Sequence, residues 1–329
     1  MIPNTFPAFR IHDDDAGYRS SIDHLSLDAL SPGEIVIKTA FSSVNFKDAL
    51  AGTGQGKILR RFPLCGGIDV AGHVVESRDP AFKEGDAVLC TGCGLSETRD
   101  GGYSAYARLE SAWAIRLPAG LDLRESMILG TAGFTAGLAL LRMQDNRQKP
   151  ELGPLAVSGA TGGVGSLAVS IFNKAGYTVH AISGKADQAT WLRSLGASDV
   201  LGRDALATSR PMESTRFGGG LDNVGGSMLA SLLAQTAPYG NVVTAGLVAT
   251  HELATTVMPF IIRGVSLLGV ASAGTARDLR DEVWRRLSSD WKPAHLDRIS
   301  TRETGLEGLP AVFTEMLAGR SFGRTLVRL

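Results

Sequence analysis

The sequence predicts an α/β protein in which a doubly wound parallel sheet accompanies a β-rich unit. Short β-type runs are closely spaced along residues 35–117, and strand and helix signals alternate from residue 155 to about residue 284. Closely spaced strands with glycine-rich turns favour an antiparallel unit such as a partly open barrel, whereas strands alternating with helices favour parallel βαβ units. The chain has 329 residues, 44% of them hydrophobic, which is enough for two cores.

The β-rich unit is predicted from strand-like segments that turn signals separate. These segments are 34–41, 70–77, 86–92, 103–109 and 113–118. Helical spacing then begins near Leu121. We expect a catalytic domain over residues 1–123, a nucleotide-binding domain over 124–270 inserted into it, and a return to the catalytic domain over 271–329, with one closing helix and one closing strand.

A glycine-rich turn, residues 160–165, follows the predicted strand Leu155–Ser158 and opens a helix whose apolar residues share one face. The turn reads ATGGVG, which fits the dinucleotide-binding fingerprint with alanine in place of the first glycine. Gly162 would let the backbone approach a pyrophosphate at the helix start, and Gly165 would let the helix pack against its strand. The alternative is a tight turn with a purely structural role.

The end of the next strand indicates which dinucleotide binds. Enzymes that use NAD place a carboxylate there on the ribose 2′-hydroxyl, but this chain has Ser183-Gly184-Lys185, and Arg203 follows the third strand. A hydroxyl and two cations would bind a 2′-phosphate that a carboxylate would repel. The pattern therefore favours NADPH over NADH, unless Lys185 and Arg203 are simply solvated surface charges.

Composition argues against several other classes of protein. Lys plus Arg equals Asp plus Glu at 33 each, so no global charge favours nucleic acid or an anionic membrane. The opening MIPNTFPAFRIHDDDAG does not look like a secretory leader, and we expect a cytoplasmic protein. Three cysteines, Cys65, Cys90 and Cys93, are too few for a disulfide framework, in agreement with a reducing compartment.

Several longer stretches extend the argument across both predicted domains. They read SSVNFKDALAGTGQGKILRRFP, GIDVAGHVVESRDPAF, MILGTAGFTAGLAL, VSGATGGVGSLAV, SLGASDVLGRD, TTVMPFIIRGVSLLGV and GRTLV. In this order they resemble the acryloyl-CoA reductase branch of the quinone-oxidoreductase-like medium-chain dehydrogenases/reductases.

The resemblance implies a Rossmann nucleotide-binding domain, a GroES-like β-rich catalytic domain and a homodimeric, zinc-free reductase that uses NADPH on an α,β-unsaturated acyl-CoA. It implies cofactor contacts at Phe46, Thr161, Gly162, Gly163, Val164, Ser183, Gly184, Lys185, Arg203, Leu247, Ile261, Ser272 and Arg324.

No metal site is expected. Zinc-dependent members of the superfamily have a cysteine where Asn45 stands and a Gly-His-Glu where this chain has Gly67-Ile68-Asp69. An amide and an isoleucine are not zinc ligands. Cys90 and Cys93 alone are half a site, and we interpret them as packing residues of the β-rich unit. Hydride transfer to an activated C=C bond needs no Lewis acid, unlike the usual oxidation of an alcohol.

Two departures from the family pattern concern the substrate. Phe46 replaces the tyrosine that the family commonly has, and Gly92-Cys93-Gly94 replaces Gly-Trp-Gly. Arg99 and Asp100 also replace an aromatic residue and a histidine.

The predicted chemistry is conjugate reduction, in which negative charge develops on the thioester oxygen. Asn45 is the leading candidate for a side-chain donor to that oxygen, with Lys47 as a nearby cation. Asn45 could instead cap a turn, and Lys47 could instead pair with Asp48 on the surface.

The substrate class has open alternatives. Lys57, Arg60 and Arg61 form a basic cluster that could meet the phosphates of CoA, or could be an ordinary solvated loop. A quinone reductase or general enone reductase would share the fold and cofactor but would not need such a cluster. A non-catalytic protein that keeps NADPH for stability or sensing is the third class.

Overall fold

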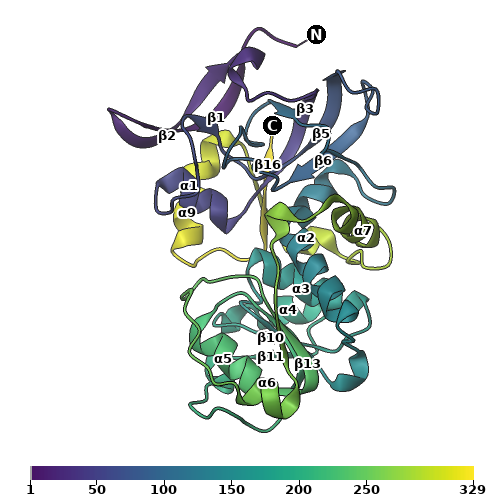
Figure 1. Ribbon diagram of the computed structural model, residues 1–329. Helices are drawn as coiled ribbons and strands as arrows, with labels where there is room; N and C mark the ends of the chain where they lie inside the picture. Colours follow the sequence, from purple (N-terminus) through teal and green to yellow (C-terminus); the bar gives the residue numbers. More distant parts are fainter. Residues whose placement is uncertain (1) are drawn as a thin grey trace. The chain divides into compact units, whose positions relative to one another are not determined.

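The computed structural model describes residues 2–329 and divides them into two compact units. Unit 1 comprises the described residues up to Thr131, together with Ala273–Asp281 and Ser300–Leu329. Unit 2 comprises Ala132–Ser272 and Glu282–Ile299. Figure 1 labels their helices and strands. The division into 1–123, 124–270 and 271–329 stays a prediction.

Unit 1 is rich in antiparallel β structure. A three-stranded sheet has the order β2-β1-β4, and a seven-stranded sheet has the order β15-β16-β3-β5-β6-β8, with β7 also paired to β3. Only the β15–β16 pair is parallel. The strands are β1 Phe6–Asp14, β2 Gly17–Leu25, β3 Ile35–Val44, β4 Leu64–Cys65, β5 Asp69–Ser77, β6 Ala87–Thr91, β7 Tyr106–Leu109, β8 Ile115–Arg116, β15 Ser300–Thr304 and β16 Arg324–Arg328.

Two helices of unit 1 pack together beside these sheets. Helix α1, Phe46–Thr53, directly follows β3, and helix α9, Leu309–Leu317, precedes β16. A Cβ atom on Gly52 would come within 2.3 Å of the Phe313 ring, so the two helices approach closely where α1 has no side chain. This contact holds the end of α1 against a buried apolar cluster that includes Phe9, Tyr103 and Phe313.

Unit 2 contains the predicted doubly wound sheet. Its six strands are all parallel in the order β11-β10-β9-β12-β13-β14, which is the arrangement of dinucleotide-binding domains. The strands are β9 Leu155–Ser158, β10 Val179–Ile182, β11 Asp199–Leu201, β12 Phe217–Asp222, β13 Thr236–Thr244 and β14 Ser266–Gly269. The strand order reverses between β9 and β12, and a ligand is expected at the carboxyl ends of these two strands.

The helices of unit 2 alternate with its strands as the sequence predicts. These helices are α3 Gly163–Lys174, α4 Ala189–Ser194, α5 Gly226–Ala234 and α6 Met258–Arg263, and a short helix, α8 Leu296–Ile299, follows the last strand of the sheet. Helix α2, Leu123–Asp145, begins in unit 1 and continues into unit 2. By length and composition α2 could cross a membrane, but 89% of its apolar window is buried inside the fold, as in a core helix.

The parallel unit is not a simple insert, because the chain returns to it after residue 281. Helix α7, Arg277–Leu287, carries Val283, Trp284 and Leu287 in its second half, and all three are fully buried. The Trp284 ring stacks on Phe134 of α2 at a centroid distance of 6.2 Å. Apolar packing therefore assigns residues 282–299 to unit 2.

Candidate functional site

The glycine-rich turn of unit 2 has the geometry of a dinucleotide-binding loop. Gly159 leaves β9 with a φ of +58°, and α3 begins at Gly163. A Cβ atom on Gly165 would lie 2.3 Å from the carbonyl oxygen of Gly159, so only glycine lets the helix approach its strand this closely. The N-cap residue of α3 is Gly162, which has no side chain with which to cap the helix. The first-turn N–H groups and the helix dipole can therefore receive an anion, and the loop fits a pyrophosphate.

Polar contacts hold the two strands together where their order reverses. The Ser158 hydroxyl donates to the buried carboxylate of Asp222 at 2.6 Å, and the Asn223 amide donates to the Ser158 carbonyl at 2.8 Å. Burial raises the pKa of Asp222 above its ordinary value. The sequence analysis missed these residues, although each stands at the end of a predicted strand. These hydrogen bonds fix the ends of β9 and β12 relative to each other, and the glycine-rich turn directly follows β9.

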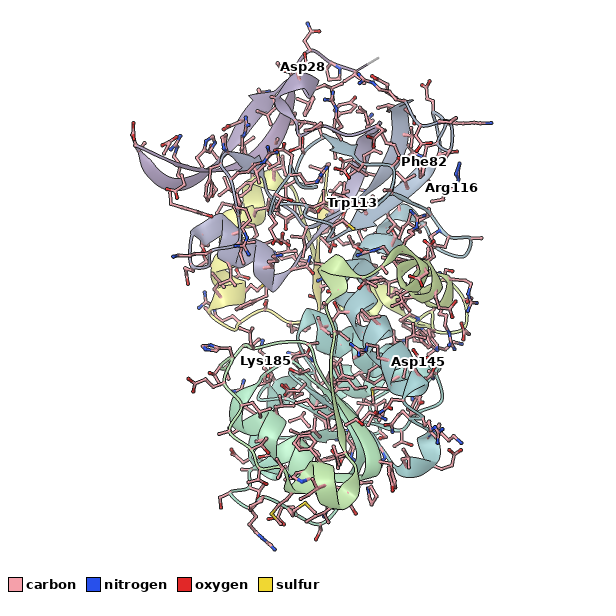
Figure 2. All side chains as sticks on the ribbon, viewed as in Figure 1. Asp28, Phe82, Trp113, Arg116, Asp145 and Lys185 are labelled. Atoms are coloured by element: carbon pink, nitrogen blue, oxygen red, sulfur yellow. The ribbon has the colours of Figure 1, made fainter. Side chains whose placement is uncertain are left out.

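The structure brings together the residues that are predicted to select the cofactor. A Cβ atom on Gly184 would lie 2.6 Å from Nε of Arg203, so the arginine side chain lies across this glycine. The Ser183 hydroxyl accepts the N–H of Lys185 at 3.0 Å and lies 3.4 Å from the Thr161 hydroxyl. Burial, and to a lesser degree the charge of Arg203, lower the pKa of Lys185 (labelled in Figure 2). Two cations and two hydroxyls are thus gathered beside the turn, a composition suited to a phosphate dianion.

Three other predicted cofactor residues lie elsewhere in unit 2. Leu247 and Ile261 are 62% and 75% exposed, and Ser272 is half-buried at the end of the unit. Their contact with a cofactor stays a prediction.

Unit 1 contains a buried polar cluster around Asp69 that the sequence analysis did not foresee. We call it the Asp69 cluster and define it as Ser43, Asn45, Asp48, Asp69, Thr131 and Arg324. Asp69 is fully buried and accepts hydrogen bonds from the Ser43 hydroxyl at 2.7 Å, the Asn45 amide at 2.8 Å and the Thr131 N–H at 3.0 Å. The Thr131 hydroxyl also donates to Asp69 at 2.5 Å, so four donors and a nearby guanidinium compensate for the desolvated carboxylate.

Arg324 supplies the positive charge of this cluster. Its side chain is 2% exposed, and one terminal nitrogen lies 3.8 Å from the Asp69 carboxylate. The guanidinium also donates to the Ile128 carbonyl, the Val44 carbonyl and the Asn45 side-chain oxygen. The resemblance implies a cofactor contact for Arg324, but in unit 1 its guanidinium is enclosed and neutralises Asp69.

Gly130 explains how α2 accommodates the cluster. Its backbone is non-helical, with a φ of +49°, and interrupts the helix. A Cβ atom at this position would come within 2.6 Å of the Asp69 carboxylate and 2.7 Å of the Ser43 hydroxyl. The position therefore requires glycine both for its conformation and for space.

Asp48 is a second buried carboxyl group in this cluster. It accepts the N–H of Asn45 at 2.8 Å, in the manner of a helix capping box, and the N–H of Ile68 at 2.9 Å. Burial, followed by the charge of Asp69, raises the pKa of Asp48 to about 7. The Asp48 carboxyl group of the folded protein therefore gains or loses its proton as the pH passes through about 7.

The candidate catalytic residues stand at the start of α1, and the structure separates their roles. Both amide hydrogens of Asn45 are committed, to Asp69 at 2.8 Å and to Asp48 at 3.2 Å. This arrangement favours the capping interpretation of Asn45 over a role as a donor to substrate. The suggested pairing of Lys47 with Asp48 is wrong, because Asp48 is buried in the cluster and the Lys47 ammonium pairs with Glu97 instead. The Phe46 ring is 39% exposed.

The remaining departures from the family pattern also have local roles in unit 1. Asp100 is buried and accepts the backbone N–H groups of Ser31 and Cys65. Arg99 pairs with Glu110. Both residues therefore hold the β-rich unit together.

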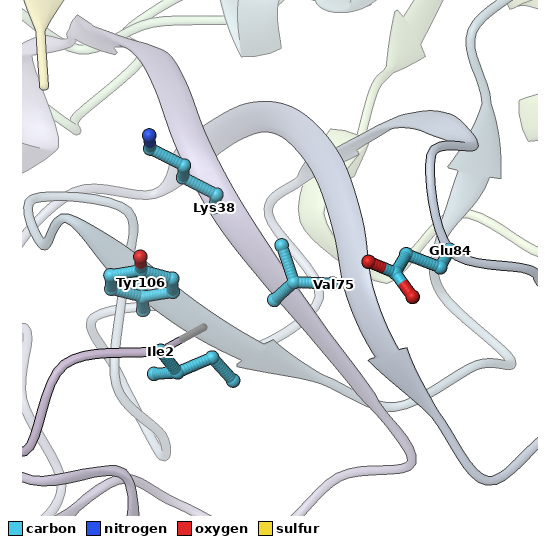
Figure 3. A pocket seen from close by; sticks show the side chains of 5 residues that line it. All are labelled: Ile2, Lys38, Val75, Glu84 and Tyr106. Carbon is cyan, nitrogen blue, oxygen red and sulfur yellow. The ribbon is translucent and has the colours of Figure 1, made fainter.

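The predicted site residues lie neither in a metal-binding cluster of the described chain nor in the lining of the pocket in unit 1. Across the part of the chain that the structure describes, no three His, Cys, Asp or Glu side chains are grouped to hold a metal ion. A pocket of about 270 Å³ in unit 1 is lined by Ile2, Lys38, Val75, Glu84 and Tyr106 (Figure 3). This pocket contains none of the predicted site residues.

Comparisons with known proteins are consistent across the chain. Residues 31–119 match the family model "Alcohol dehydrogenase GroES-like domain", and residues 163–289 match "Zinc-binding dehydrogenase". The chain is 45% identical to "Putative quinone oxidoreductase YhfP" of Bacillus subtilis, over 93% of each protein. It is 42% identical to "Probable acrylyl-CoA reductase AcuI" of Escherichia coli, over 98% of this chain and 99% of the relative.

Solved structures of relatives contain nicotinamide dinucleotides. The yhdH oxidoreductase from Salmonella enterica in complex with NADP is 42% identical, with a TM-score of 0.94 over 98% of this chain and 99% of that one. The structure of B. subtilis yhfP with NAD bound has a TM-score of 0.95 and 42% identity, over 99% of this chain and 100% of that one.

Proposed function

Since the chain belongs to the zinc-free medium-chain dehydrogenases/reductases, in their acryloyl-CoA reductase and quinone-oxidoreductase-like branch, we propose that it reduces the C=C bond of an α,β-unsaturated acyl-CoA with NADPH. It is an NADPH-dependent oxidoreductase. The single observation that carries the cofactor assignment is the gathering of Thr161, Ser183, Lys185 and Arg203 beside the glycine-rich turn.

Unit 2 supplies the residues that would hold the cofactor. The first turn of α3, Gly163 to Gly165, would bind the pyrophosphate through its N–H groups. Lys185 and Arg203 would bind the 2′-phosphate, with the Ser183 hydroxyl as a further donor. When bound, NADPH supplies the hydride. One relative was crystallised with NAD. Variants that lack Lys185 and Arg203 therefore test whether these two cations cause a preference for NADPH over NADH.

Lys47 is the proposed donor to the thioester oxygen, on which charge develops as the β-carbon is reduced. Its ammonium carries three hydrogens, and the contact with Glu97 orients the group without occupying all three of them. The start of α1 adds the positive end of a helix dipole. A preorganised donor of this kind is worth about 3 kcal/mol or more in a dry site. We assign Asn45 to positioning, because it ties the start of α1 to Asp48 and Asp69.

The basic cluster before β4 supports an acyl-CoA substrate in preference to a quinone. Lys57 and Arg60 are exposed, and Arg60 lies 3.9 Å from Glu97, the partner of Lys47. Arg61 donates to the Ser31 hydroxyl at 2.6 Å and is partly engaged in the fold. We propose that Lys57 and Arg60 meet the phosphates of CoA.

NADPH oxidation assayed side by side with several acceptors tests the proposal. We expect acryloyl-CoA and crotonoyl-CoA to be reduced faster than a simple quinone or a free enone. The N-acetylcysteamine thioester of acrylate is the matched control, because it keeps the reacting group and lacks the nucleotide. A Lys57→Ala/Arg60→Ala variant should raise KM for acryloyl-CoA and leave KM for this short thioester unchanged. Equal rates with the quinone would favour the quinone reductase, and no turnover with any acceptor would favour the non-catalytic class.

We also propose a homodimer formed through unit 2. Side chains on and before α6 are largely exposed although they are apolar, and they include Val248, Val257, Ile261 and Ile262. Strand β14, which follows α6, is the edge of the six-stranded sheet. An exposed apolar patch beside an unpaired edge strand is typical of a protein interface. Light scattering during size-exclusion chromatography measures the mass directly. The cytoplasmic location stays a prediction.

A further inference from the structure

Two cysteines stand at the end of β6 in unit 1 as Cys90-Thr91-Gly92-Cys93. Cys90 is fully buried among apolar residues such as Val70 and Leu95, and Cys93 is half-buried. The chain turns back after the strand, with φ angles of +68° at Gly92 and +51° at Cys93. Cys93 packs against the same apolar cluster that contains Cys90, so the turn keeps the two cysteines close together. The spacing is that of redox-active dithiols.

The turn is fixed on both sides by contacts within unit 1. The Cys93 N–H donates to the Ala273 carbonyl at 3.2 Å, and the Gly92 N–H donates to the Ile68 carbonyl at 2.8 Å. A Cβ atom on Gly92 would lie 2.9 Å from Cα of Ala273, so the backbone of the turn is closely packed there. The backbone that carries the two cysteines is therefore fixed by these contacts.

Three arginines surround the outer thiol. Arg280 is buried and donates to the Thr91 carbonyl at 2.8 Å, directly beneath the turn. Arg277 donates to the carbonyls of Ala112 and Ala114, and Arg99 lies over the Trp113 ring at 4.2 Å from its centroid. Figure 2 labels Trp113.

The hydrogen bond from Cys90, and then the positive charges of these arginines, lower the pKa of Cys93 to about 7 against the opposing effect of burial. The Cys90 thiol has the opposite tendency, since its pKa is raised. The half-buried position and lowered pKa of Cys93 favour it as the attacking thiolate, and the full burial and raised pKa of Cys90 favour it as the resolving thiol.

We propose that Cys90 and Cys93 form a reversible intramolecular disulfide on exposure to a hydroperoxide. With hydrogen peroxide, the Cys93 thiolate attacks one oxygen atom, an S–O bond forms as the O–O bond breaks, hydroxide leaves, and Cys93 becomes a sulfenic acid. The Cys90 sulfur then attacks the Cys93 sulfur, the S–O bond breaks, and water leaves with the thiol proton. The two thiols lose two electrons and one peroxide is reduced to two waters. Packing and redox chemistry coexist at Cys90, because it is the buried partner.

Oxidation of the intact protein with one equivalent of hydrogen peroxide, followed by alkylation, tests this proposal. We expect the wild-type mass to fall by two hydrogen atoms, a peptide map to place the disulfide between Cys90 and Cys93, and dithiothreitol to restore both thiols. Cys65→Ser is the matched control, since Cys65 is also buried and lies in another sheet, and it should form the same disulfide. Cys93→Ser should prevent the mass loss, and Cys90→Ser should leave a sulfenic acid that dimedone traps on Cys93.

The wild-type peptide map decides the matter even where a variant fails to fold. An unchanged mass, a disulfide that includes Cys65, or sulfinic acid at Cys93 with Cys90 still reduced would each overturn the proposal.

Discussion

Replacing Lys185 and Arg203 together by alanine tests how the protein distinguishes NADPH from NADH. The two side chains come from the ends of neighbouring parallel strands, β10 and β11, and meet around Gly184. The variant removes both cations and leaves the glycine-rich turn of residues 160–165 intact. Binding of the pyrophosphate should therefore persist while binding of the 2′-phosphate is lost.

The size of the effect follows from the surroundings of each cation. A charge-assisted hydrogen bond contributes about 1.5–3 kcal/mol. Arg203 is exposed, and solvent screening places it at or below the lower end of this range. Lys185 is half-buried and contributes more. Together they should be worth about 3 kcal/mol, or roughly a hundredfold in the Kd of NADPH. NADH lacks the phosphate, and its Kd should change little.

Isothermal titration of both cofactors against the variant and wild type measures this difference. Lys174→Ala/Arg193→Ala is the matched control, because it removes two exposed cations from α3 and α4 of the same unit. The control should leave the ratio of the two Kd values unchanged. Equal losses for NADPH and NADH in the Lys185→Ala/Arg203→Ala variant would refute the assignment of these residues to the 2′-phosphate.

Three further outcomes are expected. Lys47→Ala should slow single-turnover hydride transfer by about a hundredfold and leave the NADPH affinity unchanged. Asn45→Ala should instead lower the free energy of unfolding by about 1–3 kcal/mol, because two buried carboxyl groups lose a donor. A slower rate without lost stability would contradict the positioning role of Asn45. The pKa of Asp48 is about 7 in the folded protein and about 3.9 in an unfolded chain, so the folded state binds this proton more tightly and wild-type stability should fall as pH rises from about 4 through about 7. Asp48→Asn should flatten that slope in urea titrations, and an unchanged slope would exclude Asp48 as its source. Because Asn45 and Ile68 stand where zinc ligands would be, the purified enzyme should contain no stoichiometric zinc and should keep its activity in a strong chelator. Activity that is lost in the chelator and restored by added zinc would show that the enzyme depends on the metal.

Local patterns were sufficient to predict the elements around the cofactor. The apolar spacing of Val164, Leu167 and Ile171 indicated α3, and of these residues Leu167 and Ile171 are fully buried. The hairpin of β1 and β2 was missed. Most of β2 is exposed or half-buried, and a strand with one weakly buried face shows little apolar alternation.

The Asp69 cluster could not be predicted from one sequence. Ser43 and Arg324 are separated by 281 residues, and nothing in either segment indicates that they form a hydrogen bond. The same limit applies to Asn45. A turn cap was one alternative for Asn45, but only the fold shows that two buried carboxyl groups take both of its amide hydrogens. The candidate donor role was therefore assigned without knowledge of the partners that compete for it.

Deuterium transfer tests C=C reduction most directly. NADPH carrying deuterium at the transferable C4 position should be incubated with acryloyl-CoA in ordinary water, and the acyl product examined by mass spectrometry and NMR. We predict one deuterium at the β-carbon and a solvent hydrogen at the α-carbon, as conjugate reduction requires. NADPH consumption without deuterium in the acyl product, or turnover confined to quinones, would contradict the proposed reaction.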